Sequence, residues 1–446
     1  MTQFLVTMLG AGLALGLAQT PLTLEEAVRR AVAEHPAVAV GAGQSKAAAA
    51  RVEQARSGYL PKVSYVESFA RSNNPVFVFS SLLTQRQFTE SNFAVERLNR
   101  PDFLNNFQSV VSVEQTVYDW GATKAQVRSA ELGRSMAGEA QKRTQLDVIA
   151  RVVRAYYGAV LAKASLETAA VALGSAKADL ERAEAVKQAG MSTEYEVLSI
   201  RVHLAEIREA EIRRGYEYKI AMAALHEAMG VGLEEAFFLT TALSPAVLSA
   251  DAAAGFEAKA AAERPELRQV NFAAEIAQQQ RLAARSGLLP QVGVRGVFEA
   301  DRQRFVNRGG GNWLVAAQVR WNLFDGYATR AKVNEAEAME GVAKAQQKQM
   351  GAAIRLEVQK AWSEFRAAEE RIGVASAAVE QAEESLRITK NRYEAGLATV
   401  TDLLRTESAL LETKTRKLMA IHDQRWAAVM LELAAGTLAP GSDVLR

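Results

Sequence analysis

Every second position of residues 312–323, from Trp313 to Leu323, is apolar, while the positions between them are mostly polar, and this is the clearest local pattern in the chain. Successive side chains of a β-strand point to opposite faces, so the alternation predicts a strand with one apolar face. Residues 291–299 alternate in the same way and predict its partner in a hairpin. The run Asn307-Arg308-Gly309-Gly310-Gly311 between them predicts a turn or loop. The apolar positions of this hairpin are Val292, Val294, Phe298, Trp313, Val315, Val319, Trp321 and Leu323.

A noisier hairpin of the same kind is predicted within residues 59–120. Its alternating apolar positions are Val63, Tyr65, Phe69, Val111, Val113 and Val117, and Glu67 and Gln115 interrupt them. Its connection, roughly residues 71–102, is long and includes the apolar run 76–79. Connections of this length are usually functional or packed against a neighbour, and we expect the same here.

Each hairpin precedes a long stretch with the composition of a helix. Residues 122–187 and 328–393 contain no proline and are rich in good helix formers. Proline inside a helix costs about 3 kcal/mol, so its absence favours uninterrupted helices of roughly 100 Å. A short elbow and a return helix follow each long helix. In the first repeat the elbow is at Gly190, and the return helix spans 193–229 and ends at Gly230. In the second repeat the elbow is at Gly396, and the return helix spans 399–435 and ends at Gly436.

The two hairpin-and-helix segments are copies of one plan. Residues 55–61 (ARSGYLP) recur as 284–290 (ARSGLLP), an offset of 229 residues that falls once, to 206, between the two strands of the hairpin. A repeat of this length indicates a duplicated half-protein rather than a solenoid module. The predicted divisions are a signal peptide (1–18), a first repeat (19–230), a connecting segment (231–255), a second repeat (256–438, with its hairpin at 288–325) and a C-terminal tail (439–446).

Both repeats open with a helix that a proline interrupts. Residues 23–26 (TLEE) predict a capping box, and the helix that follows is interrupted at Pro36 before it resumes to Arg56. Residues 256–287 repeat this plan. The preceding apolar run, residues 4–18, is too short to cross a bilayer comfortably and predicts a secretory signal. We expect no other apolar stretch of 18 residues, and therefore no transmembrane helix, after the signal.

Composition excludes several classes of function. The net charge is +2, with no basic block interleaved with aromatic residues, so nucleic-acid binding has little support. Cysteine is absent, which excludes disulfides and thiolate metal sites. The four histidines lack the spacing of metal ligands. No cofactor site and no pair of catalytic carboxylates in a cleft is predicted.

The last return helix carries an apolar stripe with charges inside it. Val400, Leu403, Leu404, Leu410, Leu411, Leu418 and Ile421 lie within an arc of about 120°. Glu407 and Lys414 lie in the same arc, so the stripe is not a dry core seam. We interpret it as the wall of a water-filled tube.

Four strands cannot close a barrel, and hydrocarbon does not tolerate open sheet edges. We infer that the chain pools its strands with copies of itself. Two copies supply eight strands, and side chains typically fill the interior of an eight-stranded barrel. Three copies supply twelve strands, the smallest set with a usable lumen. A ring of three copies satisfies closure. The apolar strand faces then lie against lipid, with Trp313 and Trp321 as interface anchors.

Short motifs surround these elements. They are Leu24-x-Glu26-Ala27-Val28 with Pro36, the duplicated Gly-x-Leu-Pro before each hairpin, Tyr118-Asp119 and Phe324-Asp325-Gly326, Arg392-Tyr393-x-x-Gly396 with Asp402-Leu403-Leu404, and Ala435-Gly436-Thr437-Leu438. In this order, and in duplicate, they resemble the TolC-like outer-membrane efflux protein family over almost the whole chain. The resemblance implies an α+β membrane protein in the outer membrane: a homotrimeric twelve-strand β-barrel continuous with a twelve-helix periplasmic tunnel.

The resemblance also implies a role and partners. Such proteins form the exit duct of a tripartite efflux pump or type I secretion system, and they perform no chemistry themselves. They dock onto a periplasmic adaptor (membrane fusion) protein and an inner-membrane pump of the RND, ABC or MFS type. The family closes its tunnel at the periplasmic tips with polar links and acidic rings. The resemblance also implies that the elbows, Gly190 and Gly396, are the tips that contact the adaptor.

Candidate gate residues lie just after the elbows. Glu196 and Asp402 occupy equivalent positions, six residues after Gly190 and Gly396, and in a trimer they would supply six carboxylates to one ring. Arg405 stands where some relatives carry a second acidic residue, and it could pair with Asp402 or another neighbour. Tyr393 is a further candidate link. The alternative is that the charged residues are solvated and that Tyr393 is a packing aromatic.

Other functions fit the sequence less well. A periplasmic coiled-coil adaptor would show one helical hairpin flanked by β-domains, whereas this chain predicts two helical hairpins and two isolated strand pairs. A diffusion porin needs many strands and little helix. The strands could instead form the edge of an ordinary sandwich, but no sequence remains to cover their apolar faces.

Overall fold

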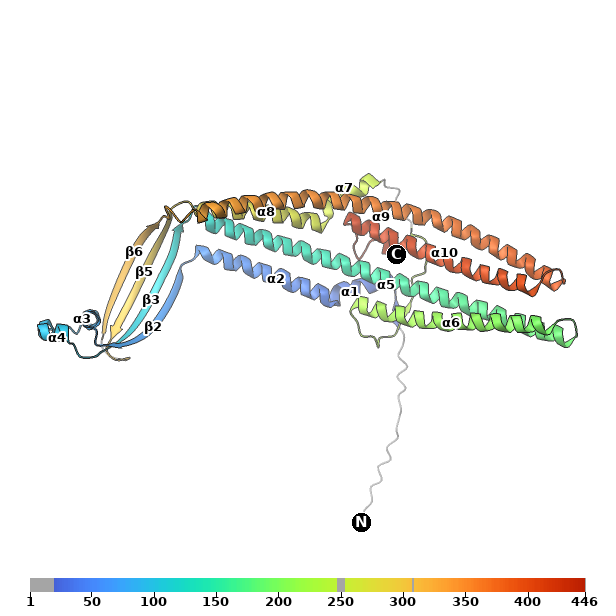
Figure 1. The fold of residues 1–446 in the computed structure, drawn as a ribbon, viewed down its shortest axis with the longest axis horizontal. Helices are drawn as coiled ribbons and strands as arrows, with labels where there is room; N and C mark the ends of the chain where they lie inside the picture. Colours follow the sequence, from blue (N-terminus) through green and yellow to red (C-terminus); the bar gives the residue numbers. More distant parts are fainter. Residues whose placement is uncertain (1–19, 247–252, 307–308, 446) are drawn as a thin grey trace, which may run out of the picture. The chain divides into compact units, whose positions relative to one another are not determined.

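The computed structural model describes residues 20–246, 253–306 and 309–445 (Figure 1). The predicted signal peptide, residues 1–18, therefore lies outside the described residues. The chain divides into two compact units. The first comprises residues 1–42, 140–265 and 351–446, and the second comprises 43–139 and 266–350. Each unit contains segments of both repeats, so the duplication does not correspond to two globular domains.

The second unit contains one antiparallel sheet built from both hairpins. Its strands, in spatial order, are β2 (Lys62–Ser72), β3 (Leu104–Tyr118), β5 (Gln291–Arg302) and β6 (Gly309–Arg320). Phe298 lies opposite both Trp313 and Val111, so apolar residues of the two hairpins share a face. Trp313 is 79% exposed and Val315 is 66% exposed, and nothing in the described chain covers them. The sheet therefore has an uncovered apolar face and two unpaired edges, β2 and β6.

Two expectations about the hairpins were wrong. Gly309–Gly311 belong to β6 and pair with Arg302, Asp301 and Ala300, so they are not a turn; residues 307–308 lie outside the described residues. Glycine lets the strand continue there because its neighbours approach too closely for a side chain. Strand β6 then ends at Arg320, and Trp321 and Leu323 follow it rather than lie within it.

The long connection between β2 and β3 is not a simple loop. It folds into α3 (Pro75–Thr84), the 3-10 turn η2 (Glu90–Phe93) and α4 (Val95–Asn99). Asn74 starts α3, since its side chain accepts hydrogen bonds from the backbone of Val76 and Phe77. Pro75 occupies the first helical turn, where its missing N–H costs nothing.

Two long helices follow the hairpins and pass through both units: α5 (Ala122–Gln188) and α9 (Ala328–Glu394). An aspartate starts each one. Oδ2 of Asp119 accepts from the backbone N of Thr123 at 2.7 Å, and Oδ2 of Asp325 accepts from that of Thr329 at 2.9 Å. The aspartate of the duplicated aromatic-Asp motif is thus a helix cap in both repeats, while the aromatic residue ends a strand only in the first repeat, at Tyr118.

The first unit contains the return helices, α6 (Glu194–Met229) and α10 (Val400–Ala435), within one residue of the predicted bounds.

The remaining helices of the described chain belong to both units. They are α1 (Leu24–Glu34), α2 (Pro36–Arg56), α7 (Ala253–Glu263) and α8 (Pro265–Ser286), with short turns η1 (Ser57–Tyr59) and η3 (Asp443–Leu445). A small parallel pair, β1 (Thr20–Leu22) and β4 (Phe237–Leu239), was not predicted. The buried Tyr156 hydroxyl donates to the Leu22 carbonyl and ties this pair to α5.

The duplicated proline kinks pack against the ends of the return helices. Gly230, at φ +73°, ends α6 beside His35 and Pro36. Gly436, at φ +74°, ends α10 beside the backbone of Glu263 and Arg264. The positive φ and the close neighbours both require glycine at these two positions. This explains why a glycine at the end of the return helix and a proline kink occur in both repeats.

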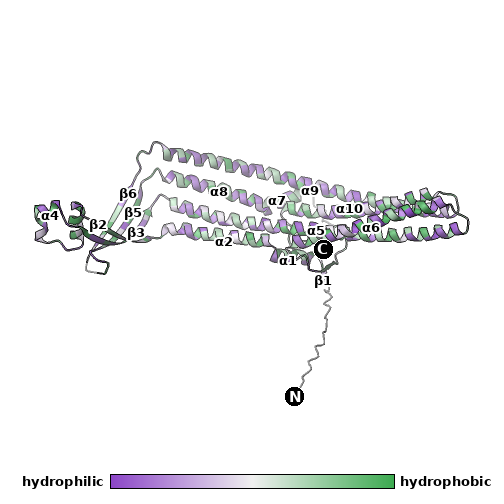
Figure 2. Ribbon diagram, turned by 60° about the horizontal axis from the view of Figure 1, so that its bottom comes forward, coloured by the Kyte–Doolittle hydropathy of each residue, from purple (hydrophilic) through white to green (hydrophobic). Residues whose placement is uncertain are grey.

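The described helices carry polar residues throughout, and Figure 2 shows polar and apolar colours alternating along them. One helix, α5, nevertheless contains an 18-residue stretch that could cross a membrane by length and composition. The expectation of no such stretch was therefore wrong. A single helix of this kind is weak evidence for a span, because core helices pass the same test.

Candidate functional site at the helix tips

The two elbows have the same hydrogen-bond geometry. In the first, Gly190 N donates to Lys187 O and Met191 N to Val186 O. In the second, Gly396 N donates to Tyr393 O and Leu397 N to Arg392 O. Both glycines have φ above +70°. These are Schellman caps, in which glycine takes the left-handed conformation that other residues adopt at a cost.

Each return helix begins with a threonine cap, and Asp402 belongs to one of them. Oγ1 of Thr399 lies 3.2 Å from the Asp402 backbone N, while Oδ2 of Asp402 accepts from Thr399 N at 3.1 Å and from its hydroxyl at 2.7 Å. This is a reciprocal capping box. The hydrogen bonds from Thr399 lower the pKa of the exposed Asp402 carboxyl. Asp402 is therefore ionised and held by its own helix.

Glu196 stands at the equivalent position of α6. Its backbone N donates to Oγ1 of Thr193 at 3.3 Å, and the Ser192 hydroxyl donates to its carboxylate. Arg405 is exposed, and no ion pair joins it to Asp402 in the described part of the chain. The capping box already engages the Asp402 carboxylate, which explains why Asp402, one of the two possible partners of Arg405, is not used.

Tyr393 is half-buried between the two helical hairpins. It packs with Leu180 and Leu404 around a small core of Ala183, Val197, Ile200 and Val400. Burial raises the pKa of its hydroxyl, and the neighbouring Glu196 and Asp179 carboxylates raise it further. Glu196, Tyr393 and Gly396 line one open cleft of about 570 Å³, whereas Asp402 and Arg405 are outside the lining. The structure thus brings Tyr393 and Glu196 to one place.

A cross-hairpin ion pair also lies at the tips. Arg182 of α5 contacts Glu394 of α9, with both side chains about half exposed. Within the first hairpin, Lys187 contacts Glu194. Sequence reasoning missed both pairs, because neither repeats at the equivalent position of the other half.

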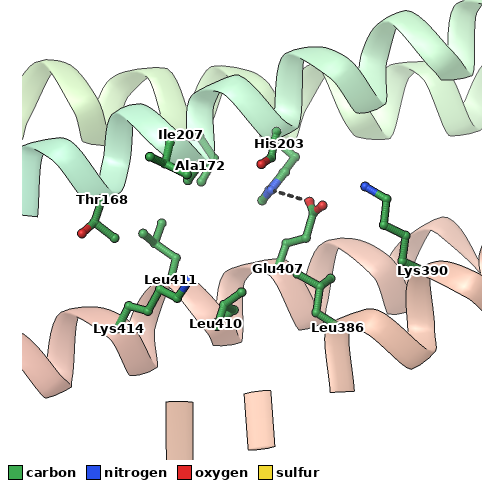
Figure 3. Close-up of a pocket in the computed structure, with 12 residues that line it drawn as sticks. Thr168, Ala172, His203, Ile207, Leu386, Lys390, Glu407, Leu410, Leu411 and Lys414 are labelled. Atoms are coloured by element: carbon green, nitrogen blue, oxygen red, sulfur yellow. Dashed lines mark ion pairs between the residues drawn. The ribbon is translucent and has the colours of Figure 1, made fainter. Parts of the chain in front are cut away.

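Four titratable side chains, one from each long helix, meet above the tips. Nε2 of His203 (α6) lies 3.5 Å from Oε2 of Glu407 (α10), as Figure 3 shows. Nζ of Lys390 (α9) lies 3.3 Å from Oδ1 of Asp179 (α5). All but Lys390 are largely buried. We call Asp179, His203, Lys390 and Glu407 the polar layer.

The polar layer corrects the interpretation of the stripe on α10. Glu407 and Lys414 were expected to face a water-filled tube. Instead they line a cleft of about 290 Å³ together with Thr168, His203 and Ile207 of the other hairpin. Glu407 is only 13% exposed and is satisfied there by His203, since a buried charge needs a partner.

The carboxyl groups of the polar layer have opposite pKa shifts. Burial raises the pKa of Asp179, and its hydrogen bond with Glu407 raises it further. Burial alone would raise the pKa of Glu407, but hydrogen bonds from His203 and Asp179 outweigh burial and lower it. The neighbouring carboxyl groups thus shift apart, with the pKa of Asp179 above its usual range and that of Glu407 below it.

Comparison of the sequence with models of protein families identifies the family of this chain. The model described as "Outer membrane efflux protein" matches residues 27–231 and 258–437, which is one match for each repeat. The chain belongs to the outer membrane efflux protein family. It is accordingly an outer-membrane protein with a helical periplasmic part, and its family transports rather than performs enzymatic chemistry.

Individual relatives agree with this assignment. The chain is 27% identical over 421 residues to protein CyaE of Bordetella pertussis, covering 94% of this chain and 84% of that protein. It is 24% identical over 396 residues to the alkaline protease secretion protein AprF of Pseudomonas aeruginosa, covering 86% and 78%. Among solved structures, the Campylobacter jejuni CmeC outer membrane channel aligns with a TM-score of 0.79 at 17% identity, covering 94% and 87%.

The similarities to these three proteins cover 94%, 86% and 94% of the chain. The α+β channel-tunnel architecture expected from the sequence is confirmed, with long helical hairpins and strands in one chain. The adaptor alternative finds no support among the family match or the relatives. The roles of individual tip residues remain predictions.

Proposed function

We propose that three copies of this chain form an outer-membrane exit duct. The observation that carries the proposal is the four-stranded sheet with an exposed apolar face and two unpaired edges, β2 and β6. Edges of this kind must pair to exist in hydrocarbon. Pairing β6 of one copy with β2 of the next makes a closed ring, and three copies give twelve strands.

The apolar face of the sheet would contact lipid. The residues proposed for this contact are Val292, Val294, Phe298, Trp313, Val315, Val319, Trp321 and Leu323. Trp321 Nε1 donates to the Leu288 carbonyl at 3.1 Å, and Trp120 Nε1 donates to the Pro290 carbonyl at 2.7 Å. Both indoles thus lie where strands join helices. Tryptophan with a satisfied N–H suits the membrane–water interface, and Trp120 joins Trp321 as an anchor.

The duct would serve a type I secretion system, with an ABC-type pump and an adaptor as partners. The name of AprF, a secretion protein for alkaline protease, favours a protein cargo. A small-molecule efflux duct is the second candidate, which the family's description favours. Deletion of the gene would separate the two: loss of one secreted protein from the medium supports the first, and drug sensitivity with unchanged secretion supports the second.

The gate would lie at the helix tips, where Glu196 and Asp402 supply acidic groups and Tyr393 contacts the Glu196 side of the cleft. Glu196→Ala with Asp402→Ala should raise single-channel conductance or weaken block by multivalent cations, because a ring of carboxylates concentrates cations. Asp402→Asn, which retains a capping side chain, is the matched control for helix fraying. Unchanged conductance and unchanged block would remove both residues from the gate.

Fractionation tests the duct itself. Membrane separation followed by crosslinking should place the protein in the outer membrane as a trimer, and the purified trimer should conduct ions in a planar bilayer. A monomer in the soluble periplasmic fraction would contradict the proposal.

A further inference from the structure

The segment between β2 and β3, residues 73–103, docks on one face of the sheet. It carries the residues that the second repeat lacks, and it folds into α3, η2 and α4. Phe88 contacts both Phe79 and Phe93, with ring centroids about 5 Å apart, so the segment has a small core of its own. We call residues 73–103 the loop segment.

A buried polar chain attaches the loop segment to the sheet. Nε2 of Gln85 donates to the Asn105 carbonyl at 2.9 Å and to Oδ1 of Asn106 at 2.8 Å. Nδ2 of Asn106 in turn donates to Oδ1 of Asp301 at 2.6 Å. Gln85 is 2% exposed and Asp301 is 1% exposed. Hydrogen bonds this deeply buried are costly to leave unmade, so they hold the segment firmly.

A glycine receives the end of α3. A Cβ atom at Gly310 would collide with the carbonyl oxygen of Thr84. Next to it, Arg86 takes a left-handed conformation at φ +55°, and its Nη2 donates to the Gly311 carbonyl at 2.9 Å. Bulkier residues at 310 would therefore displace Thr84. Gly310 thus serves the contact with α3, whereas a Cβ at Gly309 or Gly311 would meet atoms of the paired strand β5.

The loop segment covers the polar face of the sheet. Asp301 lies opposite Gln108 and Gly310, and Asn106 shares the face of Gln108 by alternation. Phe298 and Trp313 lie on the other face. The covered end of the strands is the end away from the helices, because β3 and β6 run into α5 and α9 at their opposite ends.

We propose that the loop segment is a lid that narrows the extracellular mouth of the channel. The inference rests on the proposed duct: the polar face is its lumen and the helices are periplasmic. Three lids, one from each copy, then reduce the opening through which cargo leaves. Gln85, Arg86 and Gly310 hold each lid inward, so they determine what size of cargo passes without rearrangement.

Two readouts test the lid. The chain has no cysteine, so Ser81→Cys introduces one thiol on α3, where Ser81 is 5% exposed. A membrane-impermeant maleimide should label this thiol slowly in whole cells and several-fold faster when Gly310→Ala is added. Gly310→Ala alone should raise single-channel conductance. Gly296→Ala in β5 is the matched control, because nothing lies within 4 Å of a Cβ there, and both readouts should stay unchanged.

A substitution that introduces a titratable charge should make the release of the lid from the sheet reversible with pH. Gln85→Glu places a carboxylate beside Asn106 and Asp301, so the lid should lift at neutral pH and return at acidic pH, with conductance falling again. Equal labelling with and without Gly310→Ala, or faster labelling with unchanged conductance, would overturn the lid. Absence of any conductance in the unmodified protein would instead contradict the duct, so the two failures are distinguishable.

Discussion

Single glycines hold the ends of the return helices, and their contribution can be measured. Gly436→Ala should lower the free energy of unfolding by about 1–2 kcal/mol, because a residue with a Cβ adopts the left-handed conformation at that cost. Contact with the Arg264 backbone, 3.1 Å from the new Cβ, adds to it. Thermal unfolding followed by circular dichroism would show the lower midpoint.

The matched control for Gly436 is Gly215, which lies inside α6 with nothing within 4 Å of a Cβ. Gly215→Ala should raise the midpoint, since alanine stabilises a helix interior by about 1 kcal/mol relative to glycine. If both substitutions changed stability in the same direction, the proposed role of the kink contact would be wrong.

The polar layer should make stability depend on pH through Asp179. Its pKa is raised in the folded protein, so the folded state binds the proton more strongly than the unfolded state. The stabilisation is complete below the unfolded pKa and is lost as pH rises through the folded pKa. Glu407, whose pKa is lowered, acts at lower pH: its stabilisation is lost as pH falls through its folded value.

Asp179→Asn removes this titratable group. The unfolding midpoint of the unmodified protein should fall as pH rises above the ordinary aspartate pKa of 3.8, and the variant should lose much of that slope. Glu181→Gln, at an exposed position of α5, should retain it. His203, Lys390, Glu206 and Tyr393 are the other titratable groups around the layer, and a variant that kept the full slope would exclude Asp179 as the source of the pH dependence.

Residue roles were only partly predictable from sequence. Glu196 and Asp402 were found by their repeat position, yet the pattern Thr399-x-x-Asp402 also matches a capping box, and the local hydrogen bonds engage the carboxylate. The sequence left open whether Arg405 pairs with Asp402 or with another neighbour, and no ion pair joins Arg405 to Asp402 in the described part of the chain. The partners of Glu407 come from three other helices, and distances between helices are not encoded in one helix's periodicity.

At the scale of elements, the long helices were predictable within a residue at their ends, because proline, glycine and threonine mark them. The helix α3 was not predicted, although Asn74 and Pro75 carry a start signal. Its apolar run lies between two strands and was assigned to their connection. Strands β1 and β4 are three residues long, which is too short for a periodicity to appear.

The two helical hairpins meet through the pair of Arg182 and Glu394, and this contact should affect gating more than stability. Exposed ion pairs contribute about 0–1 kcal/mol, so their loss leaves the fold intact. Arg182→Glu places two carboxylates together and should raise the open probability in single-channel recordings. The double variant Arg182→Glu with Glu394→Arg restores the attraction and should return the recordings towards those of the unmodified protein. Equal behaviour of the single and double variants would exclude this contact from gating.

At the scale of the whole molecule, closure of the barrel requires one edge of each copy to pair with the other edge of the next. Cysteines are therefore to be placed at successive positions of β2, around Ser68, and of β6, around Ala316, in a chain that has none of its own. Pairs of facing cysteines should give covalent trimers of a 48.3 kDa chain after oxidation.

Each single-cysteine variant is the control for this crosslinking, because a head-to-tail ring never brings β2 against β2 or β6 against β6. Singles should stay monomeric on denaturing gels, whereas the double variants should form dimers and trimers and no larger ladder. A dimer from β2 cysteines alone would indicate a two-fold interface with self-pairing edges. Two copies could then close only an eight-stranded barrel, and side chains fill the interior of a barrel of that size. The crosslinking pattern therefore decides between a duct and a filled barrel.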